Sequence, residues 1–331
     1  MGLQEKFTKE ALQLDCEKEV QRIVGNIRHN LKVKFKRKGL VLGLSGGIDS
    51  SVTAALCVKA VGSEKVMGLL MPERESSDET LPLSELIANH LGIETAMENI
   101  TPILEAVKCY ERRNDSIRKI IPEFTSEYKC KIVLPSVLES ESLRLFSIIA
   151  QSPEGKEIKA RLTLEAYLGI VAASNFKQRS RKMLEYYYAD KLNYAVAGTP
   201  NRLEYDQGFF VKLGDGAADT KPIAHLYKTQ VYQLAEYLEI PAEIRSRPPT
   251  TDTYSMSQSQ EEFYFSLPYD KMDLCLYGLN NNINKEEVAG VVGIAVEQLE
   301  RVYKDIEQKR RTTQYQHLSP QLVEEILHLD E

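Results

Sequence analysis

The chain has 331 residues, of which 43% are hydrophobic and 27% charged, a composition typical of a soluble globular protein. Its net charge of −6 and isoelectric point near 5.6 argue against a nucleic-acid-binding surface. The N-terminus is charged, and no run of about 18 apolar residues occurs, so we expect neither a signal sequence nor a membrane span. Five widely spaced cysteines without a CxxC pair indicate reduced thiols in the cytoplasm, and five histidines without ligand spacing indicate no zinc site.

Residues 9 to 36 carry apolar side chains at roughly helical spacing, which predicts one helix. The short apolar run from Leu40 to Leu44 predicts a strand buried on both faces. The glycine turn at 45–47 lets the backbone approach a ligand, and Asp49 and Ser50 then open a helix. A helix start leaves unpaired N–H groups and a partial positive charge near such a turn. Strand, turn and helix start together predict a phosphate-binding site.

This loop is not a Walker A motif, because no Lys precedes the final Ser, and its glycines lack the spacing of the dinucleotide fingerprint. The pattern SGGxDS at 45–50 resembles the pyrophosphate-binding loop of ATP pyrophosphatases. Enzymes of that group cleave ATP between the α and β phosphates and activate a substrate as an adenylate. The alternative is an ordinary tight turn between a strand and a helix.

Strands are expected at 65–72 and 95–100, with a helix at 81–91 between them that turns Ser84 toward solvent. This alternation predicts an α/β fold with a doubly wound parallel sheet and helices on both faces. Ligands bind such sheets at the carboxyl ends of the strands, which is where the loop at 45–50 lies.

Residues 101 to 160 show a weaker pattern, with strands expected at 131–134 and 143–150 and a turn at 152–156. We interpret this stretch as an insertion or interface element within a single domain that covers residues 1–331.

A long helix is expected over 162–188, broken or bent near Gly169, and then a buried strand at 193–197. A glycine-acid loop at 214–219 precedes a helix that ends at Leu238. Residues 241–253 are rich in Pro, Arg and Thr, which is typical of a loop and makes them a candidate lid. Residues 266–331 are expected to form C-terminal helices, most clearly at 286–291, 297–309 and 321–329.

Four motifs together resemble the ammonia-dependent NAD synthetase family: GLSGGIDSS at 43–51, NFKQRSR at 175–181, the long block at 198–230, and EQKRR at 307–311. The block at 198–230 is the specific one, because SGGxDS alone fits several adenylating enzymes. The resemblance implies a homodimer with the adenine nucleotide α-hydrolase-like fold. It also implies that the protein makes NAD from deamido-NAD, ATP and ammonia through an adenylated carboxylate, releasing AMP and pyrophosphate.

The resemblance also implies a role for individual residues. The ATP site would comprise Gly43, Leu44, Ser45, Gly46, Gly47, Ile48, Asp49, Ser50, Thr199, Lys228 and Thr250, with Asp49 and Lys228 catalytic. Asp49 and Glu204 would hold Mg²⁺. Arg179, Lys212, Asp219, Gln308 and Lys309 would hold deamido-NAD. The structural alternatives are a helix cap for Asp49, a solvated loop acid for Glu204, an exposed basic helix face for Arg179 and a turn closure for Asp219.

The sequence departs from the family at four places: Gln308 replaces a common His, residues 200–201 are Pro-Asn, residues 250–265 replace an acidic lid tail, and 101–160 is longer. The alternatives are therefore a ligase for a different carboxylate, an ATP pyrophosphatase acting on a tRNA base or guanine nucleotide precursor, or a non-catalytic nucleotide-binding subunit. The acidic charge argues against tRNA, and the set Asp49, Glu204 and Lys228 argues against a binding-only role. We expect ammonia to come from solution or from a separate glutaminase, because the stretch before Gly39 is too short for a fused one.

Overall fold

The computed structural model describes residues 6–135, 137, 145–248, 250, 253–256, 258–265, 267–324 and 326, with only the backbone of Glu261 and Glu262. No helix among these residues is long and apolar enough to cross a membrane. All five cysteines carry free thiols, as the sequence predicts.

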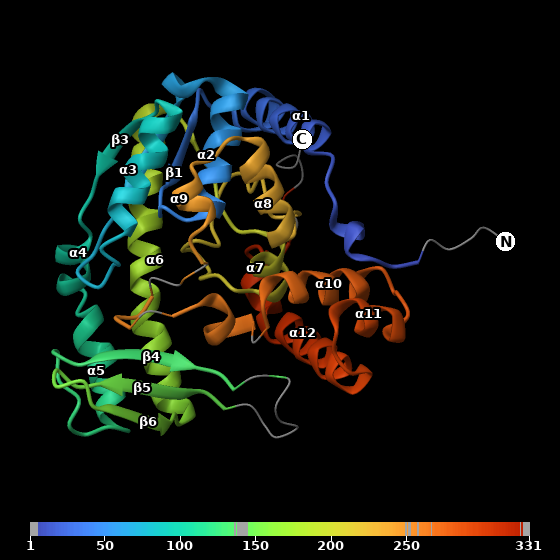
Figure 1. Cartoon of the computed structure of the whole chain (residues 1–331). Coiled ribbons are helices and arrows are strands. Elements are labelled where there is room, and N and C mark those ends of the chain that lie inside the picture. Colours follow the sequence, from blue (N-terminus) through green and yellow to red (C-terminus); the bar gives the residue numbers. More distant parts are fainter. Residues whose placement is uncertain are drawn as a thin grey trace.

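A parallel four-stranded sheet forms the centre of the fold, in the order β3-β2-β1-β7 (Figure 1). Its strands are β1 (Leu40–Gly43), β2 (Val66–Leu70), β3 (Glu94–Met97) and β7 (Ala195–Val196). The predicted parallel α/β fold is therefore confirmed. Because the first connection, α2 (Ile48–Val61), starts directly after the glycine turn, the predicted loop lies at the carboxyl end of β1.

Helices cover both faces of the sheet, because alternate side chains of β1 point to opposite sides. Leu40 and Leu42 pack with α1 (Cys16–His29), α2, α3 (Thr80–Leu91) and α8 (Lys228–Tyr237). Val41 packs on the other side with α4 (Thr101–Ala106), α5 (Cys109–Arg118) and α6 (Leu164–Leu192). The side chains on both sides of β1 are buried. This packing fixes the positions of the strand ends next to the site.

A second, antiparallel sheet extends along α5 and α6 away from the central sheet (Figure 1). It contains β4 (Lys129–Val133), β5 (Ser147–Gln151) and β6 (Glu157–Arg161). The turn predicted at 152–156 joins β5 to β6, with Gly155 at φ +85°. The predicted strand at 143–150 begins only at Ser147, and positions 143 and 144 lie outside the described residues.

The C-terminal part is helical and packs around its own core with α7 (Arg202–Gln207). It consists of α10 (Tyr269–Asn280), α11 (Lys285–Val292) and α12 (Val296–His317). Shorter elements are 3₁₀ turns at Lys9–Leu12 and Ser63–Lys65, α9 (Ala242–Arg245) within the predicted loop, and single π-helical segments at Asn30–Phe35 and Glu261–Phe265.

Three predictions about helices are wrong. Residues 9–36 do not form one helix, because residues 13–15 are extended and Asp15 caps a new helix by accepting a hydrogen bond from the Lys18 N–H. Helix α6 runs unbroken through Gly169, where a side chain would lie 2.3 Å from the Ser116 hydroxyl, so this glycine permits close packing of α5. The helix expected at 321–329 is absent from 321–324, and its remainder falls largely outside the described residues.

Candidate active site

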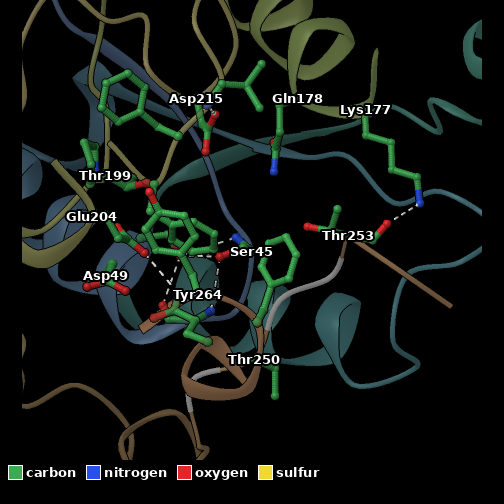
Figure 2. A pocket seen from close by; sticks show the side chains of 18 of the residues that line it. Ser45, Asp49, Lys177, Gln178, Thr199, Glu204, Asp215, Thr250, Thr253 and Tyr264 are labelled. Carbon is green, nitrogen blue, oxygen red and sulfur yellow. Dashed lines mark hydrogen bonds between the residues drawn. The ribbon is translucent and has the colours of Figure 1, made fainter. Parts of the chain in front are cut away.

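A cavity of about 1120 Å³ lies at the carboxyl ends of the central strands (Figure 2). Its walls come from the glycine loop, α6, the segment around residues 250–264 and the start of α8. The cavity contains ten of the eleven predicted ATP-site residues: Gly43, Leu44, Ser45, Gly47, Ile48, Asp49, Ser50, Thr199, Lys228 and Thr250. Residues that are distant in sequence thus converge on one site.

The glycine loop is held in shape by its own hydroxyl groups. The Ser50 hydroxyl donates to the Gly47 carbonyl at 3.0 Å and lies 3.1 Å from the Ser45 hydroxyl. Gly46, the one predicted residue outside the cavity wall, has φ +67°, and a side chain there would lie 2.7 Å from Leu83 Cβ. Glycine is therefore required for the turn to pack against α3.

Ser84 supports the loop from α3, contrary to the prediction that it faces solvent. It is buried, and its hydroxyl donates to the Leu44 carbonyl at 3.0 Å and to the Thr80 carbonyl at 2.7 Å. The helical periodicity placed Ser84 on the solvent side of α3, but the glycine loop covers that side of the helix.

Asp49 is the centre of the polar contacts in the cavity. Its carboxylate accepts hydrogen bonds from Asn201 Nδ2 at 3.1 Å and from Lys228 Nζ. The helix cap position is Gly47, so the alternative role of Asp49 as a simple cap does not describe this geometry. The contacts bring together α2, the turn before α7 and the first residue of α8.

Lys228 is buried and points at Asp49 rather than into solvent. Burial alone would lower the pKa of Lys228, but the carboxylates of Asp49 and Glu204 outweigh it and raise the pKa. The lysine is therefore a fixed positive charge beside the glycine loop.

Glu204 lies next to Asp49 (Figure 2), and burial together with the Asp49 charge raises its pKa. Its two oxygens accept hydrogen bonds from the Asn201 N–H at 3.2 Å and from Gln260 Nε2 at 3.0 Å. Asn201 in turn accepts from the Leu203 and Glu204 N–H groups, which completes a capping box at the start of α7. Glu204 is thus held at a helix start and is not a solvated loop acid.

The sequence interpretation missed three residues that position these groups. Asp273, buried on α10, accepts hydrogen bonds from the Lys228 and Thr229 N–H groups at 3.2 and 2.7 Å. Asn201 belongs to the Pro-Asn pair at 200–201, which the sequence analysis noted only as a departure from the family pattern. Gln260 lies in the stretch 250–265, which was noted for the same reason. The pattern N-x-x-E at 201–204 is a recognisable capping signal, whereas nothing local links Asp273 to α8.

The predicted deamido-NAD residues lie in three places, and only one of these is the cavity wall. Gln308 and Lys309 on α12 line the cavity, and Lys309 Nζ contacts the Tyr264 carbonyl at 2.7 Å and Asp305 at 2.8 Å. Arg179 and Lys212 lie together outside the cavity wall, with Arg179 Nε donating to the Lys212 carbonyl at 3.3 Å. Asp219 accepts from the Val196 N–H at 2.7 Å and from the Tyr186 hydroxyl at 3.3 Å, which ties its loop to β7.

A buried ionic network continues from the cavity wall into the space between α5 and α6. Lys177 Nζ lies 2.8 Å from Glu73 and 2.8 Å from Glu75. It also lies 3.0 Å from the Thr253 carbonyl (Figure 2). Arg113 binds Glu75 through both terminal nitrogens, at 2.6 and 2.9 Å. The Tyr110 hydroxyl completes the network by donating to Glu73 at 2.6 Å.

Comparisons with known proteins place the whole chain beside one family. The NAD synthase family model matches residues 19–123 and 150–316. The NH₃-dependent NAD⁺ synthetase of Mesorhizobium japonicum is 59% identical over 315 residues, covering 95% of this chain and 99% of the relative. That of Rhizobium meliloti is 55% identical and covers 97% of this chain and 96% of the relative.

Solved structures show the same fold. An NH₃-dependent NAD synthetase from Campylobacter jejuni superposes with a TM-score of 0.61 at 24% identity, covering 94% of this chain and all of that one. An NMN synthetase from Francisella tularensis superposes with a TM-score of 0.60 at 23% identity and similar coverage.

Proposed function

This chain belongs to the NAD synthase family, and from that premise we propose that it amidates deamido-NAD to NAD with ammonia and ATP. The enzyme is a carbon–nitrogen ligase. In the proposed course of reaction, the nicotinate carboxylate attacks the α-phosphate of ATP, displacing pyrophosphate and forming an adenylate. Ammonia then attacks the activated carbonyl, and AMP leaves as the amide forms.

The observation that carries this proposal is the constellation of Asp49, Lys228 and Glu204 beside the glycine loop. The N–H groups at the start of α2 are suited to bind the departing pyrophosphate. Lys228, kept protonated by the neighbouring carboxylates, adds a positive charge where negative charge builds up on the leaving group. Holding the carboxylate in line with the α-phosphate supplies a further part of the acceleration.

We propose Mg²⁺ as the cofactor, held by Asp49 and Glu204. Two carboxylates that face one cavity, completed by phosphate oxygens and water, form the donor set that Mg²⁺ prefers. No group of three or more His, Cys, Asp or Glu in the described part of the chain forms a metal cage, which fits a metal that arrives with ATP. When bound, the ion would neutralise negative charge on the phosphates.

The decisive experiment incubates the purified chain with ATP, Mg²⁺, deamido-NAD and ammonium and follows NAD and AMP by mass spectrometry. We expect NAD and AMP in equal amounts, and only when all four components are present. A second tube replaces ammonium with glutamine and is expected to give no NAD, since we propose that ammonia comes from solution or a separate glutaminase.

The second candidate function is amidation of a different carboxylate, favoured by Gln308 and the altered lid tail. A third tube therefore contains nicotinate mononucleotide in place of deamido-NAD. AMP release in that tube alone would overturn deamido-NAD as the substrate while keeping the ligase chemistry.

We also propose a cytoplasmic homodimer that uses the exposed side of α6. Leu164, Leu168, Met183 and Tyr187 are each more than half exposed and fall on one side of that helix, within an arc of about 140°. The two pairs lie about four helical turns apart, and exposed apolar side chains gathered on one side of a helix typically mark a protein–protein interface. Arg179 lies on the same side, one turn before Met183.

The Leu168→Glu/Met183→Glu variant is expected to be monomeric at micromolar concentration, because two carboxylates would lose hydration at the interface. Size-exclusion chromatography with light scattering measures the mass. Val33→Glu is the matched control, since Val33 is also more than half exposed but lies outside α6. A dimer of unchanged mass in the double variant would move the interface elsewhere.

A further inference from the structure

The two segments matched by the family model leave residues 124–149 between them, and β4 lies wholly within that stretch. Strand β4 pairs with β5 along one edge, and no second strand among the described residues pairs with its other edge. An open edge presents unpaired N–H and C=O groups that attract another extended segment.

That edge is occupied by the lid segment, which we define as residues 253–256 and 258–265. The Cys130 N–H donates to the Ser255 hydroxyl at 2.9 Å, and the Met256 N–H donates to the Cys130 carbonyl at 3.1 Å. Two residues further along β4, the Ile132 carbonyl accepts a hydrogen bond from Gln258 Nε2. The contacts thus follow alternate residues of β4, as an added strand would.

Apolar contacts reinforce the docking. Tyr254 of the lid segment is buried in the hydrophobic core of the second sheet, and Phe263 packs against the same core. Their rings lie 5.6 Å apart and nearly perpendicular to each other. The lid segment therefore shares a core with the second sheet.

The far part of the lid segment reaches the Glu204 carboxylate. Gln260 donates to Glu204 at 3.0 Å, and Thr253, Tyr254, Gln260, Phe263 and Tyr264 all line the cavity. Only one residue separates Gln258, which contacts β4, from Gln260, which contacts Glu204. A shift of Gln258 away from β4 would therefore also move Gln260 relative to Glu204.

We propose that Ser255 and Gln258 are positioning residues, which anchor the lid segment to strand β4 and thereby hold Gln260 on Glu204. The departures at 101–160 and 250–265 would then be linked, because strand β4, which lies in the first, holds the lid segment, which lies in the second. The catalytic part of this proposal rests on the proposed function, whereas the docking does not.

The test compares the Ser255→Ala/Gln258→Met variant with the unaltered chain. Because both side-chain anchors are removed, we expect amide hydrogen exchange in residues 253–265 to accelerate by about tenfold. We expect kcat for NAD formation to fall by about tenfold, with the KM for ATP within about twofold, because Glu204 is misplaced while the glycine loop is intact. Two single variants isolate the role of the Ser255 hydroxyl. Ser255→Ala removes it and is expected to speed lid exchange, whereas Ser255→Thr keeps it and is expected to leave lid exchange slow.

Two further variants separate positioning from general destabilisation. Ser152→Ala removes a hydroxyl that accepts from the Lys156 N–H at 3.3 Å, in the same sheet but at its β5–β6 turn. It is expected to leave both lid exchange and kcat unchanged. Gln260→Leu is expected to lower kcat as the double variant does while lid exchange stays slow, because the anchors remain.

Unchanged exchange in the double variant would overturn the docking, and accelerated exchange with unchanged kcat would overturn the positioning role. Exchange that accelerates equally in β5 and β6 would show unfolding of the sheet and also contradict the proposal. If the unaltered chain makes no NAD but its lid exchange still responds to the variants, the proposed function fails and the docking stands.

Discussion

In the Asp49→Asn variant we expect kcat for NAD formation to fall by about two to three orders of magnitude while ATP still binds. The substitution keeps an oxygen for the hydrogen bond from Asn201 Nδ2 but removes the negative charge. Without that charge the proposed metal loses a ligand, and Lys228 loses the carboxylate that its Nζ contacts. The glycine loop, which we propose binds the phosphates through its N–H groups, is unchanged.

Single-turnover assays measure the chemical step, and isothermal titration with ATP measures binding. Asp206→Asn is the matched control, because Asp206 lies on α7 two residues after Glu204 and its side chain is 10% exposed, compared with 18% for Asp49. Its carboxylate, however, pairs with Arg310 at 2.6 and 2.8 Å outside the main cavity. We expect this control to lose stability but to retain turnover. Normal turnover in Asp49→Asn would remove both the metal-ligand and the charge-pairing roles of Asp49.

The position of the glycine loop in the candidate site could be predicted from the sequence because its signals are local. Within twelve positions the chain has a five-residue apolar run, two turn glycines and a helix start. Strand, turn and helix can therefore be predicted from residues that are close together in the sequence. The structure adds the two partners of Asp49, which are Asn201 and Lys228, at 152 and 179 residues further along the chain. Such contacts depend on how the chain closes and leave no local pattern.

The lid and the second sheet were the least predictable parts for the same reason. Cys130 and Ser255 are 125 residues apart, and each appears unremarkable in its own segment. The two departures from the family pattern were visible in the sequence, but their contact with each other was not. Gly169 illustrates the opposite error, in which a local rule suggested a helix break where tertiary packing against Ser116 requires a small residue.

The largest loss of stability is expected for Lys177→Met. The Lys177 side chain is 2% exposed and faces the fully buried carboxylate of Glu73 and that of Glu75. Removing the cation leaves two enclosed carboxylates that keep the contacts of Arg113 with Glu75 and of the Tyr110 hydroxyl and the Glu75 N–H with Glu73, but lose the one cation that contacts both. We expect the free energy of unfolding to fall by about 3–5 kcal/mol, the usual cost of breaking a buried ion pair from one side.

Urea denaturation followed by circular dichroism measures this loss. Lys119→Met is the matched control: Lys119 and Glu165 pair at 2.5 Å, but both are more than half exposed, so we expect a loss of about 0–1 kcal/mol. Equal losses in the two variants would show that burial does not strengthen the Lys177 network.

The Lys177→Met/Glu73→Gln double variant identifies the source of the loss. If the single substitution is costly because it strands a buried charge, neutralising Glu73 as well should recover part of the stability, although the hydrogen bond to the Thr253 carbonyl stays broken. A double variant at least as unstable as Lys177→Met would instead assign the loss to packing of the lysine stem and to the release of Thr253. In that case the network would act chiefly as a support for the lid segment, and the two variants should then share the faster lid exchange expected when its anchors are removed.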